Sequence, residues 1–285
     1  MNETEFVAAL RKLPLHPGAR GLEDDCAVLR VGGETLIITH DMMVEDTHFL
    51  GDADMADVAW KLLAANLSDL AAKGAEPVGV LLGYSLGGDD ARFLAGLDEG
   101  LRTHGVALMG GDTVATTGTS TYGLTAIGRA THCPVPSRKG AQAGDAIYVT
   151  GPIGRAMLGY EGDAQHLVAF NRPVPRLAEG IALAPLVSAM MDISDGLLLD
   201  CWRMGWASGV TLAIESAAVP VACRARAGEC LRWGDDYELL FTVPESTRVP
   251  VPATRIGTVC ARERAPLWLD GTPLPDPADL GYCHG

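Results

Sequence analysis

Short apolar runs with the character of β-strands recur along the chain, alternate with helical patterns, and fall on both sides of one irregular segment. Before residue 131 these runs cover residues 27–31, 35–41, 78–86, 106–109 and 122–129. After residue 144 they cover residues 146–150, 187–192, 210–214, 237–243 and 254–259. Such alternation is typical of α/β and α+β proteins. The intervening segment, 131–144, holds two prolines and two glycines without periodicity, which indicates a linker between two domains, 1–134 and 135–285.

The strongest helical pattern runs from about Asp54 to Lys73. Asp54 suits an N-cap, leucines recur at helical spacing, and Gly74 stands where a helix commonly ends. Asp69 falls near the end of this helix, where the helix dipole disfavours a carboxylate, so a cation is expected beside it. Two interpretations stay open: a solvated Asp69 pairs with Lys73 four residues on, or Asp69 holds a metal ion.

Aspartates also stand where the apolar runs begin or stop. Asp24 and Asp25 precede one run, and Asp41, Asp112 and Asp192 end or follow others. An aspartate at a strand end is commonly only turn chemistry. Several carboxylates in one place repel one another unless a cation joins them. The set therefore favours a divalent metal with oxygen ligands, and Mg²⁺ fits better than zinc because Cys/His spacing is lacking.

Two further segments have the character of phosphate sites. In Gly110-Gly111-Asp112-Thr113, the glycines permit close approach of an anion to the backbone. In Asp192-Ile193-Ser194-Asp195-Gly196, a strand leads into an apolar helix over residues 197–207. Ser194 or Asp195 can cap that helix and do nothing more, or the helix N-terminus can also bind a phosphate and its metal.

Composition excludes several classes of protein. The formal net charge of −14 argues against a nucleic-acid or anionic-membrane partner. No apolar run approaches the length of a membrane span, and the first residues are acidic where a signal peptide is basic. Seven cysteines without a C-x-x-C pair indicate reduced thiols and a cytoplasmic location. Phosphate-binding P-loop and protein-kinase motifs are absent, so any phosphoryl transfer needs another architecture.

Seven short segments of the chain, in their order along it, resemble the thiamine-monophosphate kinase family, within the aminoimidazole ribonucleotide synthetase-like superfamily. The resemblance runs from about residue 20 to the C-terminus. The segments are residues 21–29, 39–49, 61–75, 110–113, 138–145, 192–197 and 234–239.

The resemblance implies an N-terminal α/β domain that dimerises through its sheet, a C-terminal α+β domain, and ATP bound between them. It implies direct transfer of the ATP γ-phosphate to thiamine monophosphate with Mg²⁺, giving thiamine diphosphate. The implied metal ligands are Asp25, Thr39, His40, Asp41, Asp69, Asp112, Asp192 and Asp195. The implied ATP contacts are Gly111, Asp112, Arg138 and Ser194, and the implied thiamine monophosphate contacts are His48, Asp235 and Tyr282.

The chemistry agrees with this resemblance. The nucleophile is already an anionic phosphate oxygen, so the difficulty is to bring two polyanions together in line. We therefore expect Asp41 and Asp112 to act through metals and Arg138 to supply a fixed cationic fork. Without the resemblance, His48 and Tyr282 are ordinary surface or packing residues.

Four positions depart from the family pattern: Glu23, His40, Val114 and Trp233. These departures affect the expected closure of the protein around its substrate more than the expected metal site. The alternatives are another ATP-using enzyme of the superfamily and a non-catalytic nucleotide-binding relative.

Overall fold

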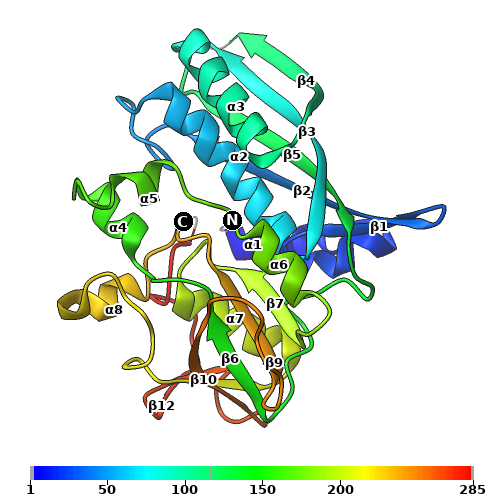
Figure 1. Cartoon of the computed structure of the whole chain (residues 1–285), viewed down its shortest axis with the longest axis vertical. Coiled ribbons are helices and arrows are strands. Elements are labelled where there is room, and N and C mark those ends of the chain that lie inside the picture. Colours follow the sequence, from blue (N-terminus) through cyan, green and yellow to red (C-terminus); the bar gives the residue numbers. More distant parts are fainter. Residues whose placement is uncertain (1–2, 116, 284–285) are drawn as a thin grey trace.

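The computed structural model describes residues 3–115 and 117–283 and contains two β-sheets, one on each side of residues 131–144 (Figure 1). No helix or strand interrupts that segment, as expected for a linker. The mixed α/β prediction is confirmed. The assignment of two domains, 1–134 and 135–285, stays a prediction. Within the described residues, no helix is both long and apolar enough to cross a membrane.

The first sheet has five strands, and all its neighbours are antiparallel except the last pair. Its order is β1 (Ala27–Val31), β2 (Glu34–Val44), β5 (Thr121–Ala130), β3 (Ala75–Leu86) and β4 (Leu108–Ala115). Two helices, α2 (Met55–Ala72) and α3 (Asp90–His104), pack together beside this sheet (Figure 1). A short helix α1 (Glu3–Leu10) and a 3₁₀ segment η1 (Pro17–Leu22) precede β1.

The second sheet has seven strands. Its order is β12 (Thr272–Leu274), β11 (Leu267–Leu269), β8 (Thr211–Ile214), β10 (Thr254–Cys260), β6 (Asp145–Val149), β9 (Leu239–Pro244) and β7 (Ala189–Asp192). The accompanying helices are α4 (Arg155–Tyr160), α5 (Leu167–Asn171), α6 (Leu177–Leu183), α7 (Leu197–Ser208), η2 (Arg224–Arg226) and α8 (Ala227–Cys230).

Helix α2 joins the two halves. Fifteen of its eighteen residues are buried, as expected for a helix that is apolar on every side. It contacts β2, β3, β5 and α3 of the first half and also β7 and α6 of the second. The expected ends are confirmed: the Asp54 side chain accepts a hydrogen bond from the Ala56 amide, and Gly74 takes a φ of 59°. A Cβ at Gly74 would lie 2.4 Å from that of Ala184 on the adjoining segment, so both conformation and packing require glycine.

Among the strand boundaries that differ from the expectation, two involve aspartates expected in the site. Asp41 was expected to end a strand, but β2 continues to Val44, which pairs with Thr121 of β5. Asp112 was expected to follow a strand, but it lies within β4, opposite Gly83 of β3. In both places the neighbouring strand extends beyond the aspartate, so backbone pairing continues although the side-chain pattern suggests a turn.

Candidate functional site

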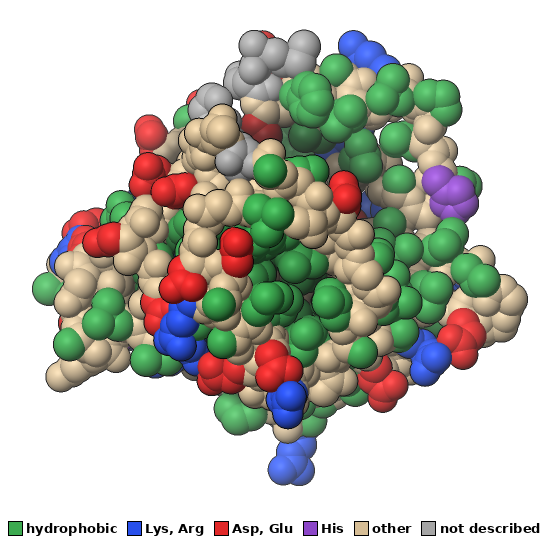
Figure 2. All heavy atoms as spheres, turned by 90° about the horizontal axis from the view of Figure 1, so that it is seen from above, with side chains coloured by type: hydrophobic (Ala, Val, Ile, Leu, Met, Phe, Trp, Pro, Cys, Tyr) green, Lys and Arg blue, Asp and Glu red, His purple; other side chains and the backbone are tan. Residues whose placement is uncertain are grey.

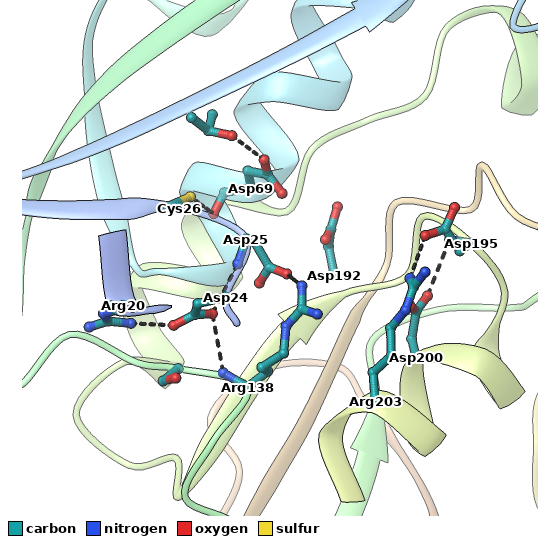
Figure 3. Close-up of polar contacts among 12 residues, drawn as sticks. Arg20, Asp24, Asp25, Cys26, Asp69, Arg138, Asp192, Asp195, Asp200 and Arg203 are labelled. Atoms are coloured by element: carbon teal, nitrogen blue, oxygen red, sulfur yellow. Dashed lines mark hydrogen bonds and ion pairs between the residues drawn. The ribbon is translucent and has the colours of Figure 1, made fainter. Parts of the chain in front are cut away.

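Three aspartates from separate parts of the chain meet where the two halves join (Figure 3). Asp25 lies in the loop before β1, Asp69 in the last turn of α2, and Asp192 at the end of β7. One carboxylate oxygen from each lies within 4.8 Å of the others. Such an all-oxygen set suits a hard divalent cation such as Mg²⁺.

The electrostatics of this cluster also favour a cation. Burial raises the pKa of Asp69, and the carboxylates of Asp41, Asp192 and Asp25 raise it further. Burial and Asp25 raise the pKa of Asp192 to about 8, and burial, Asp25 and Asp195 raise the pKa of Asp41 to about 6. Among the described residues, no Lys or Arg forms an ion pair with Asp41, Asp69 or Asp192. Like charges in an enclosed site are stabilised by a bound cation or by protons.

Asp25 differs because two cations hold it. The Lys73 ammonium lies 2.6 Å from Asp25 Oδ2 and 2.6 Å from Asp24 Oδ1, and the Arg138 guanidinium pairs with Asp25 Oδ1. Burial opposes ionisation of Asp25, but Arg138 and Lys73 outweigh burial and lower its pKa. The interpretation of Lys73 as a solvated surface partner of Asp69 is therefore wrong. Lys73 is buried, and its side chain reaches back to the loop before β1.

Side chains of β2 and α2 contact the remaining acids. The Thr39 hydroxyl of β2 donates to Asp69 Oδ2, and the Ser68 hydroxyl donates to Asp192 Oδ2 at 2.6 Å. The Asn66 side-chain oxygen accepts from the Asp41 backbone N–H at 3.1 Å. The sequence patterns did not indicate Ser68 as part of the site. Its only signal was a polar residue within a largely apolar helix, which also contains Lys61, Asn66 and Asp69.

Asp195, three residues after Asp192, has a cation of its own. Arg203 pairs with Asp195 and, at 3.0 Å, with the buried Asp200 (Figure 3). The expectation that Ser194 or Asp195 caps α7 is wrong: the N-cap is Gly196, and no side chain of the described residues caps this helix. The Asp195 side chain turns toward Arg203 and is therefore not directed at the first amides of α7.

A cleft of about 970 Å³ opens beside the cluster. Nine of the residues expected in the site line it, namely His40, Asp41, His48, Asp69, Asp192, Ser194, Asp195, Asp235 and Tyr282. Six aromatic side chains share this lining: Phe49, Tyr160, Phe170, Trp233, Tyr237 and Tyr282. Three of them, Tyr160, Phe170 and Trp233, gather around Tyr160, and Tyr160 and Phe170 were not expected in the site. The ring centroids of Tyr160 and Trp233 are 5.1 Å apart, and those of Tyr160 and Phe170 are 5.4 Å apart. The cleft thus combines acidic groups with an aromatic wall.

The remaining expected residues fall in two places. Asp25, Thr39 and Arg138 are not among the residues that line the cleft. Arg138 pairs with Asp25, and Thr39 donates to Asp69, which does line it. Gly111 and Asp112 lie apart from the cleft, on the exposed strand β4. A Cβ at Gly111 would stand 1.9 Å from the Leu82 carbonyl oxygen, so close pairing of β3 and β4 already requires this glycine.

Comparisons with known proteins agree with this architecture. Residues 23–130 match the family model described as AIR synthase related protein, N-terminal domain. A thiamine-monophosphate kinase from Salmonella typhimurium is 37% identical, over 89% of this chain and 88% of its own. One from Caulobacter vibrioides is 34% identical, over 99% and 91%.

Solved structures show the same fold. The thiamine-monophosphate kinase of Stenotrophomonas maltophilia superposes with a TM-score of 0.77 at 30% identity, covering 95% of this chain and 96% of its own. AaThiL complexed with AMPPCP and TMP superposes with a TM-score of 0.88 at 24% identity, covering 100% and 97%. The fold is the two-domain aminoimidazole ribonucleotide synthetase-like fold, and the chain belongs to the thiamine-monophosphate kinase family.

Proposed function

We propose that this protein transfers the γ-phosphoryl group of ATP to the phosphate of thiamine monophosphate, forming thiamine diphosphate and ADP. The observation that carries this proposal is the convergence of Asp25, Asp69 and Asp192 at one end of a cleft with an aromatic wall. Family membership supports it, and so does the ATP analogue and TMP held by the structurally similar AaThiL. The enzyme is thus a phosphotransferase with a phosphate group as acceptor.

Mg²⁺ is the cofactor that the acidic site fits best. Asp25, Asp69 and Asp192 would hold it, with Asp41 and Asp195 from the same cleft and Thr39, His40 and Asp112 as the other ligands implied by the family motifs. When bound, Mg²⁺ neutralises phosphate oxygens and the developing charge of the transfer. Asp69 and Asp192 lack a cationic partner among the described side chains, which supports a metal at this place.

Arg138 is suited to a phosphate of ATP. Its guanidinium pairs with Asp25, and its Nε is buried without a hydrogen-bond partner among the described residues. An unsatisfied buried donor is costly, and a phosphate oxygen would satisfy it. Arg138 therefore orients the donor phosphates while Asp25 fixes the guanidinium. Ser194, at the cleft wall before α7, is proposed as a second ATP contact.

The acceptor occupies the aromatic end of the cleft in this proposal. His48, Asp235 and Tyr282 line the cleft together with Tyr160 and Trp233. Aromatic faces attract organic cations such as a thiazolium, and a carboxylate complements the same charge. The acceptor phosphate oxygen needs no general base because it is already anionic. Binding both molecules in one cleft then supplies proximity and alignment.

We also propose a homodimer formed through the first sheet. Every residue of β4 is exposed, including Met109 and Val114, which are 59% and 55% exposed. Figure 2, viewed from the end of the molecule where β3 and β4 lie, shows hydrophobic side chains gathered on that face. An exposed apolar sheet with an unpaired edge is commonly covered by a partner. Asp112 and Gly111 lie on this strand, so their proposed roles require the second copy.

We also propose a cytoplasmic location for the reaction. The seven cysteines are all unpaired, as expected in a reducing compartment.

The direct test is an assay of the purified protein with Mg²⁺, ATP and thiamine monophosphate. Equal amounts of thiamine diphosphate and ADP are expected. Hydrolysis of ATP that ignores the thiamine compound would favour another ATP-using enzyme of the superfamily. Nucleotide binding without any turnover would favour a non-catalytic relative.

A further inference from the structure

Lys61 is a buried lysine of α2 whose ammonium lies between two segments that line the cleft. Its Nζ is 2.7 Å from Asp235 Oδ2, donates to the His48 carbonyl oxygen at 3.3 Å, and lies 3.8 Å from the centroid of the Phe170 ring. The side chain is only 3% exposed. Lys61 thus joins the segment after β2 to the segment before β9, and both contribute to the cleft wall.

Asp235 is held in place at both carboxylate oxygens. Lys61 holds Oδ2, and the Tyr237 hydroxyl donates to Oδ1 at 3.1 Å. The backbone N–H of Asp235 donates to the Ser194 carbonyl at 2.8 Å, and its φ is 64°. A left-handed backbone at a residue other than glycine is unfavourable and persists where the surroundings enforce it. The Asp235 side chain is nevertheless 30% exposed and lines the cleft.

This arrangement differs from a buried ion pair that only stabilises the fold. The cation of the pair is enclosed, whereas the carboxylate keeps an open side toward the cleft. Each carboxylate oxygen can accept more than one hydrogen bond. Lys61 and Tyr237 therefore fix the orientation of Asp235 and leave lone pairs for a ligand in the cleft.

Helix α2 carries both Lys61 and Asp69, which belongs to the metal cluster. Lys61 and Asp69 are eight residues apart, which corresponds to about 12 Å along a helix and to about 80° around its axis. The buried helix therefore holds a cation at the aromatic end of the cleft and an acid at the other end. A ligand with an organic head and a phosphate tail suits this separation.

We propose that Lys61 is a positioning residue for the acceptor: it orients Asp235 toward the cationic or amino-bearing heterocycle of a thiamine phosphate and does not contact the phosphate. This inference rests on the proposed function. The contact with the His48 carbonyl gives Lys61 a second role, because it fixes that segment relative to Asp235. Tyr237 contributes the weaker part of the same constraint.

The test compares two ligands that differ only in the phosphate. Binding of thiamine monophosphate and of thiamine is measured by calorimetry for the wild-type protein and for Lys61→Met. Loss of a charged hydrogen bond predicts weakening of both ligands by about tenfold or more. The KM for thiamine monophosphate should rise similarly, while the KM for ATP stays within about twofold. Lys61→Arg should restore part of the affinity, and Lys12→Met, a change at an exposed lysine, should leave both affinities unchanged.

Two results would overturn this inference. Weaker binding of thiamine monophosphate with unchanged binding of thiamine would show that Lys61 contacts the phosphate. Unchanged binding of both would show that Lys61 only stabilises the fold. If Lys61→Met does not fold, Tyr237→Phe removes one hydroxyl from Asp235 and should weaken both ligands several-fold; unchanged affinities would then refute the inference. Failure of the wild-type protein to bind or phosphorylate thiamine monophosphate would instead refute the proposed function.

Discussion

Replacement of Lys73 by Met should reveal how much the protein depends on the cation within its acidic loop. The Asp24 and Asp25 side chains are only 2% and 6% exposed, and the Lys73 ammonium lies 2.6 Å from an oxygen of each. Removal of one partner of a buried ion pair costs about 3–5 kcal/mol. Asp24 keeps Arg20 and Asp25 keeps Arg138, so we expect the lower end, about 3 kcal/mol of lost unfolding free energy.

Urea denaturation in EDTA measures this loss, with Lys12→Met as the control at an exposed lysine. The double variant Asp24→Asn/Lys73→Met removes one charge of each sign and should recover part of the stability. Mg²⁺ should also stabilise Lys73→Met more than the wild-type protein, because a bound divalent ion supplies positive charge to Asp25. A Lys73→Met protein as stable as wild type in EDTA would refute the assignment of Lys73 as the internal counter-ion.

Three further predictions concern protons, partners and the interface. Burial raises the pKa of Asp41 to about 6 and that of Asp192 to about 8. Because the folded state holds these protons more tightly than the unfolded chain does, the unfolding free energy in EDTA should fall as the pH rises from about 4 to 8. Mg²⁺ should reduce this fall. Thermal melts across that range with and without Mg²⁺ check this, and parallel curves would contradict it. If each cleft takes Asp41 from one chain and Asp112 from its partner, the Asp41→Asn and Asp112→Asn variants should each be inactive alone. The two variants refolded together as an equal mixture should regain about a quarter of wild-type activity. No recovery would show that both groups belong to one chain or lie outside the site. Val114→Asp should shift the sedimentation of the protein from dimer to monomer, whereas Leu94→Asp on α3 should not; a Val114→Asp dimer would exclude β4 from the interface.

Local sequence patterns predicted the elements well, because most depend on burial that has a clear period. Helix α2 begins after Asp54 and ends before Gly74 as expected, and β1 has the expected bounds. The errors arose where neighbouring strands decide the outcome. β2 and β4 continue through Asp41 and Asp112 because β5 and β3 offer backbone partners on that side.

The site was less predictable than the fold, since its contacts join residues far apart in the chain. Spacing alone suggested Asp69 and Lys73 as partners, but Lys73 pairs with the loop nearly fifty residues earlier. Lys61 was not expected in the site at all, because its partner Asp235 lies in the other half of the protein. Buried polar residues within an apolar helix were the available signal, and their partners required the structure.

The central claim is that Asp25, Asp69 and Asp192 together hold the divalent ion that allows two phosphorylated molecules to approach each other. A crystal of the protein grown with Mn²⁺ and a nonhydrolysable ATP analogue tests it most directly, because Mn²⁺ scatters anomalously. We predict an anomalous peak within ligand distance of oxygens from all three carboxylates, next to the analogue's phosphates. An analogue bound in the cleft with no peak among these three aspartates would contradict the claim.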